Sequence, residues 1–273
     1  MVAMKDVIKL ATDIYLPTSK KEKYFPALIN RTPYNKDRVE NSKEINSYIS
    51  AGYAVVFQDV RGRYHSEGKF IPYEYEIENG IELFNWVRKQ AWSNGIFGLF
   101  GLSYHGGTQW LPATKNPKGL KAMVPMITFY DLYNGSAYYD GAKVLHDLRW
   151  TIADIIPDIM ERAKKAREKV LVDVPEVYNC LEKFPLASDK AVKLYGKYYL
   201  DWMKHSTFDD FWKKFSPKEH YNNITVPTLN ISGWYDIFVP GTLNNYMGMK
   251  KNGGNEIAKA NSYGAMEPFE FFR

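Results

Sequence analysis

The sequence has 273 residues, of which 45% are apolar and 16% are aromatic. This is enough to bury one substantial core, or one core and a smaller accessory domain. Lys and Arg number 36 against 31 Asp and Glu, so the net charge of +5 is small for this size and argues against a nucleic-acid partner. The single cysteine, Cys180, excludes an internal disulfide.

Neither the N-terminus nor any internal segment has the character of an export signal or a membrane anchor. Residues 1–16 mix charged and apolar side chains and contain no continuous apolar stretch. No window approaches the roughly 18 apolar residues of a membrane span. We therefore expect a soluble, cytoplasmic protein without a membrane partner.

Sequence motifs for metals and nucleotides are not found. The chain has no H-E-x-x-H pattern and no Cys/His cluster that would bind a metal. It also has neither a G-x-G-x-x-G nor a Walker pattern for a nucleotide. We expect no metal and no cofactor.

The first half of the chain alternates short apolar runs with longer amphipathic segments. Strands are predicted over residues 9–16, 26–31, 53–58, 96–100 and 120–126, and a helix over residues 78–90, where apolar residues recur at helical spacing. This alternation is typical of a mostly parallel sheet covered by helices, which indicates an α/β fold.

The character of the sequence changes between residues 132 and 223, where helical, Lys-rich and strongly aromatic sequence replaces the strand-like runs. We interpret this segment as a helical cap inserted into the core. A strand at residues 228–232 and a helix at about 241–251 resume the earlier pattern. The predicted organisation is a discontinuous core, residues 1–131 and 224–273, and a cap at 132–223.

Ser103 lies between an apolar strand and a glycine-rich helix start, in the sequence Gly-Leu-Ser-Tyr-His-Gly at 101–106. A nucleophile elbow needs this arrangement, because the serine occupies a strained turn and small residues are required where strand and helix approach closely. The general G-x-S-x-G pattern is not met, since His105 precedes the second glycine. The alternative is a structural glycine turn.

Asp236 ends the sequence Gly-Trp-Tyr-Asp at 233–236, directly after a late strand. In α/β hydrolases the acid that orients the catalytic histidine follows such a strand and comes after the serine in the chain. Taken alone, Asp236 is also a typical N-cap for the helix that follows. The order of Ser103 and then Asp236 favours the catalytic interpretation.

Tyr34 follows an early strand, in the sequence Arg-Thr-Pro-Tyr at 31–34. α/β hydrolases supply half of their oxyanion hole from this position. The Tyr34 hydroxyl and the backbone N–H of Tyr104 are therefore candidate oxyanion donors. Without the other motifs, a surface turn would explain Tyr34 equally well.

Together these motifs resemble the cocaine esterase and Xaa-Pro dipeptidyl-peptidase (CocE/NonD-type) family of serine hydrolases. The family's GxSYxG, GWYD and RxPY motifs match residues 101–106, 233–236 and 31–34, and the opening at residues 10–17 also fits. The resemblance continues to about Tyr263, although the cap matches only loosely. It implies an α/β-hydrolase fold with a helical cap.

The resemblance also implies a mechanism and a substrate class. Ser103 would attack the carbonyl of a small ester, amide or Xaa-Pro peptide, Tyr34 and the Tyr104 amide would hold the oxyanion, and Asp236 would orient a histidine base. Phe238 and Trp150 would line the acyl pocket. Both are also typical core aromatics.

The sequence has no histidine at the position where this family carries the catalytic base. In this family the base follows the acid in a GPWSH-like motif, whereas all five histidines precede Asp236, namely His65, His105, His146, His205 and His220. His65, in the loop after a core strand, is the least implausible substitute, and surface or core positions are expected for the others. An alternative function is therefore a catalytically impaired, truncated remnant or binding protein.

The sequence after Tyr263 is expected to lack the last core strand and the C-terminal β domain of the family, as if the reading frame were truncated or shifted. A sheet that ends early exposes an unpaired edge, so self-association is expected.

Overall fold

The computed structural model describes residues 1–18, 22–39 and 42–267. Its centre is a seven-stranded sheet in the order β11-β10-β7-β6-β4-β5-β3, in which β3 alone runs antiparallel to its neighbour. The strands are β3 (Thr12–Tyr15), β4 (Phe25–Thr32), β5 (Ala54–Asp59), β6 (Ser93–Leu102), β7 (Leu120–Met126), β10 (Leu229–Gly233) and β11 (Tyr263–Glu267). The predicted mostly parallel sheet is confirmed.

Helices cover both faces of the sheet, as the alternation of side chains along β5 shows. Val55 and Phe57 pack with Ile45 of α1 (Lys43–Ser50), whereas Val56 belongs to the cluster formed by α2 (Glu76–Arg88) and α3 (Tyr104–Ala113). Successive residues of a strand point to opposite faces, so a strand that is buried throughout requires a layer on each side. The result is a helix–sheet–helix sandwich.

Several predicted boundaries agree with the structure, and one differs in an informative way. The strand at residues 120–126 is β7, and the predicted helices at 78–90 and 241–251 are α2 and α10 (Val239–Asn252). The run at 9–16 is divided instead into β2 (Lys9–Leu10), which pairs with β1 (Val2–Ala3), and β3, which joins the main sheet. A short helix, α11 (Glu256–Ala260), follows α10, and a 3-10 turn, η1 (Lys36–Val39), follows β4.

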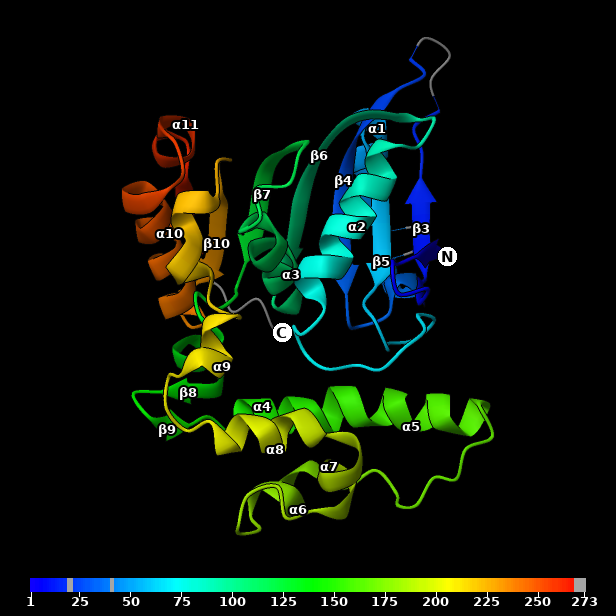
Figure 1. The fold of residues 1–273 in the computed structure, drawn as a ribbon, viewed down its shortest axis with the longest axis vertical. Coiled ribbons are helices and arrows are strands. Elements are labelled where there is room, and N and C mark those ends of the chain that lie inside the picture. Colours follow the sequence, from blue (N-terminus) through cyan, green and yellow to red (C-terminus); the bar gives the residue numbers. More distant parts are fainter. Residues whose placement is uncertain (19–21, 40–41, 268–273) are drawn as a thin grey trace.

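The chain between β7 and β10 is mostly helical, and α4, α5 and α8 lie across the end of the sheet at which the parallel strands finish (Figure 1). Its elements are the π-helical turn η2 (Tyr133–Ala137), α4 (His146–Trp150), the π-helical turn η3 (Thr151–Ile155), α5 (Ile156–Lys165), α6 (Val177–Leu181), α7 (Lys190–Tyr195), α8 (Lys197–Lys204), α9 (Asp210–Lys213) and the 3-10 turn η4 (Pro217–Asn223). The expectation that strands disappear here is wrong at one place, since β8 (Tyr138–Tyr139) and β9 (Ala142–Lys143) form a small hairpin.

A single apolar cluster joins this helical segment to the sheet. It includes Tyr104 and Phe129 from the sheet side and Ile152, Tyr199 and Trp212 from the helices, all of them buried. The helical segment is therefore packed on the end of the sheet through aromatic side chains.

The chain after Ser262 forms a strand, which corrects the expectation that this strand would be missing. β11 pairs parallel with β10 along five residue pairs, from Leu229 with Tyr263 to Gly233 with Glu267. The backbone of Trp234 also donates to the carbonyl of Glu267, at 3.2 Å. The strand therefore supports the loop that carries Asp236.

Within the described part of the chain, no helix is both long and apolar enough to cross a membrane.

Candidate active site

Ser103 occupies the turn between β6 and α3. Its backbone has φ of 61° and ψ of −125°, a conformation that a residue with a side chain adopts only under local strain. Its N–H donates to the carbonyl of Met126 in β7, at 2.9 Å. Gly106 must be glycine because a Cβ there would lie 2.5 Å from the side chain of Thr128. The sharp strand–turn–helix arrangement predicted from the sequence is present, with the serine partly exposed on it.

Tyr34 approaches Ser103 from the end of β4. Its side chain lines the same small cavity as Ser103, and its hydroxyl accepts a hydrogen bond from the indole N–H of Trp150, at 3.2 Å. Burial raises the pKa of Tyr34, so the hydroxyl keeps its proton at neutral pH. The N–H of Tyr104 is at the first position of α3, where helix N–H groups lack partners within the helix. The Tyr34 side chain and the first turn of α3 therefore both adjoin Ser103.

A buried ion pair supports this part of the site from below. Arg31 of β4 pairs with Glu76 at the start of α2, with 2.6 Å between Nη1 and Oε2, and also donates to Gln58. The Tyr104 hydroxyl donates to the other oxygen of Glu76, at 3.0 Å. Both charged side chains are less than 5% exposed. The network connects β4, β5, α2 and α3 directly beneath the elbow.

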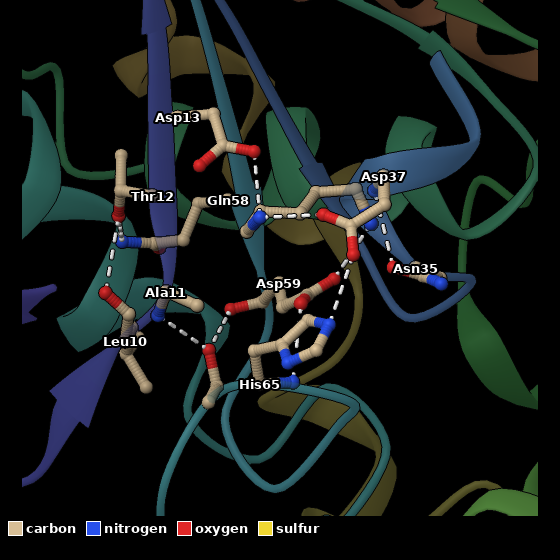
Figure 2. Close-up of polar contacts among 11 residues, drawn as sticks. Leu10, Ala11, Thr12, Asp13, Asn35, Asp37, Gln58, Asp59 and His65 are labelled. Atoms are coloured by element: carbon tan, nitrogen blue, oxygen red, sulfur yellow. Dashed lines mark hydrogen bonds and ion pairs between the residues drawn. The ribbon is translucent and has the colours of Figure 1, made fainter. Parts of the chain in front are cut away.

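Polar contacts fix the loop that follows Tyr34 (Figure 2). One oxygen of the Asp59 carboxylate accepts from the N–H of Lys36 at 2.8 Å, and the other accepts from the N–H of His65 at 3.3 Å. The Lys36 ammonium lies 2.6 Å from carboxylate oxygens of both Asp13 and Asp37, and His65 Nε2 lies 2.9 Å from Asp37. The loop is thus tied to β3 and β5.

Asp236 lies in the turn between β10 and α10. One of its carboxylate oxygens accepts from the N–H of Phe238, at 2.6 Å. The N-cap residue of α10 is Phe238, so Asp236 does not take the N-cap position that its sequence context also allowed. Burial raises the pKa of Asp236, and the Phe238 N–H and a Coulombic interaction with His146 oppose that effect. His146 is therefore an electrostatic neighbour of the acid.

A small cavity of about 40 Å³ adjoins Ser103, roughly the space of one or two water molecules. Its walls are formed by Tyr34, Tyr73, Ser103, Ser136, His146, Asp147, Trp150, Trp202 and Phe238. The cavity unites Ser103 and Tyr34 with Trp150 and Phe238, four residues singled out from the sequence. Asp236 and the Tyr104 side chain are not among its lining residues.

The cap supplies cavity residues that the sequence did not single out. Asp147 is buried and accepts from Ser136 at 3.0 Å, with Lys143 Nζ 3.5 Å from its other oxygen. Trp202 of α8 and His146 of α4 form the rest of this wall of the cavity. The His146 ring packs edge to face against Phe238, with 6.1 Å between the ring centroids. No local motif marks these residues, because packing of separate helices brings them together.

The five histidines, all of which lie in described residues, have distinct environments. His105, next to the elbow in sequence, has Nε2 2.8 Å from Thr32, and burial lowers its pKa to about 4. His65, the substitute favoured from the sequence, pairs with Asp37 and lines a separate cavity. His205 pairs with Asp209, and His220 lies in η4. His146 is the histidine found in the wall of the Ser103 cavity.

The residues that the structure describes contain no group of three or more His, Cys, Asp or Glu side chains that could hold a metal ion.

The fold and the turn at Ser103 define an α/β hydrolase of the serine type. The chain belongs to the X-Pro dipeptidyl-peptidase (S15) family, whose sequence pattern matches residues 6–268. It is 32% identical over 266 residues to the cocaine esterase of Rhodococcus sp. (strain MB1 Bresler), an alignment that covers 92% of this chain and 46% of that protein. The family resemblance predicted from the motifs is thereby confirmed.

Solved structures agree on the fold. An aminopeptidase from a marine sediment archaeon of the Thaumarchaeota superposes with a TM-score of 0.71 at 24% identity, covering 97% of this chain and 47% of that one. An α-amino acid ester hydrolase superposes with a TM-score of 0.70, also at 24% identity, covering 98% of this chain and 47% of that one. The chain therefore spans about half the length of these three relatives.

Proposed function

We propose that this chain is an acyl hydrolase that cleaves small esters, amides or Xaa-Pro peptides through an acyl-enzyme on Ser103. The observation that carries the proposal is the strained backbone of Ser103 beside the Tyr34 hydroxyl. The family description names an X-Pro dipeptidyl-peptidase, and the relative with 32% identity is named as a cocaine esterase. A serine nucleophile can cleave both an ester and a peptide bond through an acyl-enzyme.

The proposed reaction has two steps. The Ser103 oxygen forms a bond to the substrate carbonyl carbon as a base removes the hydroxyl proton, and collapse of the tetrahedral intermediate expels the alcohol or amine with that proton. Water then attacks the acyl-enzyme in the same way and restores the serine. The Tyr34 hydroxyl and the Tyr104 N–H would stabilise the oxyanion, and Asp236 would stabilise the protonated histidine.

His146 is our proposed base within this sequence. Two observations support it, namely its place in the wall of the Ser103 cavity and the packing of its ring against Phe238, two residues after Asp236. A catalytic hydrogen bond is often long before substrate binds, so we expect the His146–Ser103 hydrogen bond to form in the complex with substrate. The resemblance implies a different source, a histidine after the acid.

The size of the cavity bears on the substrate. Phe238 and Trp150 are proposed to line the acyl pocket together with the cap residues around Asp147. The small volume of this cavity, about 40 Å³, favours a short acyl chain as the group bound next to Ser103. We propose that residues 132–223 act as this cap over a core formed by residues 1–131 and 224–273.

A second candidate is a binding protein that retains the pocket but has lost hydrolysis. It is favoured by one observation: among the described residues, none of the five histidines hydrogen-bonds Ser103. An inactivated triad in a well-formed site still reacts roughly 10³–10⁴-fold faster than water, so weak esterase activity alone would not separate the two candidates.

Fluorophosphonate labelling separates the two functions, because the probe modifies only an activated serine. The reaction is followed by intact mass for the parent chain, Ser103→Ala and Tyr34→Phe. The hydrolase proposal expects stoichiometric labelling that Ser103→Ala abolishes and that Tyr34→Phe slows by about 10²-fold, the usual effect of removing one oxyanion donor. A folded parent chain that stays unlabelled would favour the binding protein.

A further inference from the structure

Arg63 is a fully buried arginine in the loop after β5, with 0% of its surface exposed. Its guanidinium makes hydrogen bonds in two directions. Nε donates to the carbonyl of Pro33 at 2.8 Å, while Nη1 and Nη2 donate to the carbonyls of Ile155 and Asp154 at 3.0 and 2.8 Å. One planar group therefore bridges the core and the helices that cover it.

Both ends of this bridge lie next to residues of the site. Pro33 immediately precedes Tyr34, and Asp154 and Ile155 end the η3 turn, which begins directly after Trp150. The Trp150 indole in turn donates to the Tyr34 hydroxyl at 3.2 Å. Arg63, the Pro33–Tyr34 backbone, the Tyr34–Trp150 hydrogen bond and the η3 turn thus form a closed loop of contacts around the hydroxyl beside Ser103.

Burying this charge is costly unless the group is paired and hydrogen-bonded, and Arg63 has a carboxylate and two rings around it in addition to its hydrogen bonds. The Asp158 carboxylate lies 3.3 Å from Nη1, and the rings of Tyr64 and Phe70 lie 5.1 and 5.2 Å from the guanidinium carbon. A buried ion pair is by itself weak evidence for a stabilising role. For Arg63 a structural role is favoured instead, in which its hydrogen bonds fix the positions of the backbone groups that accept them. The planar fork of arginine, unlike an ammonium, reaches all three carbonyls at once.

We infer that Arg63 is a positioning residue that sets the Tyr34 hydroxyl for the oxyanion of the reaction at Ser103. The inference rests on the proposed acyl transfer and names the residue that holds its oxyanion donor in place. Arg63 touches neither Ser103 nor the cavity, so it acts only through Tyr34 and Trp150.

Arg61 offers a matched control two residues away. It is also buried, at 8% exposed, and it also donates three hydrogen bonds, to Asn79 at 3.0 Å and to both oxygens of Asp6 at 2.6 and 3.0 Å. None of these partners lies on the Tyr34 loop or in the cap. Loss of either guanidinium removes a comparable network, but only Arg63 contacts the backbone beside Tyr34.

The test compares Arg63→Lys with Arg61→Lys, each alone and combined with Tyr34→Phe, by kcat and KM for p-nitrophenyl acetate and by the rate of fluorophosphonate labelling. Arg63→Lys is expected to lower kcat and the labelling rate at least tenfold with less than a twofold change in KM. In the Tyr34→Phe background the same substitution is expected to cost less than twofold. Arg61→Lys is expected to leave both rates within twofold. Two results would overturn the inference. One is an equal decrease of kcat and labelling rate in Arg63→Lys and Arg61→Lys. The other is a decrease caused by Arg63→Lys that is as large in the Tyr34→Phe background as in the parent chain.

A second readout does not depend on activity. The indole N–H resonance of Trp150, assigned by its disappearance in Trp150→Phe, reports the Tyr34–Trp150 hydrogen bond in the intact chain. It is expected to shift in Arg63→Lys and not in Arg61→Lys, and an unshifted resonance would overturn the inference even if Ser103 proves unreactive. If Arg63→Lys does not fold, Asp158→Asn is measured instead. This substitution removes the carboxylate beside the Arg63 guanidinium and is expected to shift the same Trp150 resonance.

Discussion

The indole N–H of Trp150 donates to the hydroxyl of Tyr34, with 3.2 Å between the two heavy atoms. Trp150 ends α4 in the cap and Tyr34 follows β4 in the sheet, so this single bond joins the two layers beside Ser103. Because the bond consumes one lone pair of the phenol oxygen, it favours an orientation in which the Tyr34 proton is free for another acceptor. The cap therefore contributes to the electrostatics of the site as well as to its walls.

Trp150→Phe is expected to slow acyl transfer to Ser103 about 3- to 10-fold, since it removes the donor but keeps an aromatic ring in the cavity wall. The measurement is the fluorophosphonate labelling rate, with unfolding in urea as a check on stability. Trp202→Phe is the control, because Trp202 lines the same cavity without bonding Tyr34. Equal slowing by both substitutions would show that the ring shape matters and the hydrogen bond does not.

The residues of local motifs could be found from the sequence, whereas those assembled by packing could not. Ser103, Tyr34 and Asp236 each follow a strand in a short recognisable motif, and strand ends of a parallel sheet converge at one edge. His146, Asp147 and Trp202 lie on helical turns with no distinguishing pattern, and only the docking of α4 and α8 brings them to Ser103. From the sequence alone, an aromatic residue of the cap is equally well interpreted as part of the hydrophobic core.

Secondary structure was predictable where hydrophobic periodicity was strong. Residues 120–126 are a short, mostly apolar run that begins directly after Gly119, and they form β7 as predicted. β11 was missed because its residues Tyr263–Glu267 include glycine and alanine and lack the apolar run of a buried strand, yet β10 provides it with a complete ladder. Tertiary pairing outweighs weak local propensity at this edge of the sheet.

The Arg31–Glu76 ion pair predicts a large stability effect from a single isosteric change. Glu76→Gln is expected to lower the free energy of unfolding by about 3–5 kcal/mol, because it leaves the buried Arg31 guanidinium without its counter-charge. Urea denaturation at pH 7 measures the effect. Glu74→Gln, which loses a partly exposed pair with Lys214, is the control and is expected to cost only about 0–1 kcal/mol. Similar losses in the two variants would contradict the assigned role of Glu76.

His146→Gln tests the base within this sequence. Glutamine keeps hydrogen-bonding groups in the cavity wall but cannot accept the serine proton, so labelling of Ser103 is expected to slow about 10²-fold or more. His65→Gln is the control, because His65 pairs with Asp37 outside the Ser103 cavity, and it is expected to leave the rate within twofold. An unchanged rate in His146→Gln would exclude His146 as the base and leave it as a wall of the acyl pocket.

The stability of the chain is expected to depend on pH through Asp59. Burial raises the pKa of Asp59 to about 6, although the N–H groups of Lys36 and His65, which donate to its carboxylate, lower it. The folded chain therefore holds the Asp59 proton more tightly than the unfolded chain, whose carboxyl titrates near 3.8. The stabilisation that this proton provides is fully present below about pH 4 and is lost as the pH rises through about 6.

Asp59→Asn cannot titrate, so the stability of the parent chain relative to this variant is expected to fall by about 2–3 kcal/mol between pH 4 and pH 7. Urea denaturation at several pH values gives the two curves. Because a Coulombic interaction with His65 also acts on Asp59, the comparison is repeated with His65→Gln in both chains, which isolates the carboxyl. The prediction would be contradicted if the stability curves of the parent chain and Asp59→Asn stay parallel across this range, with and without His65→Gln. Parallel curves would mean that the Asp59 carboxyl is ionised in the folded chain throughout. The N–H groups of Lys36 and His65 would then stabilise the carboxylate.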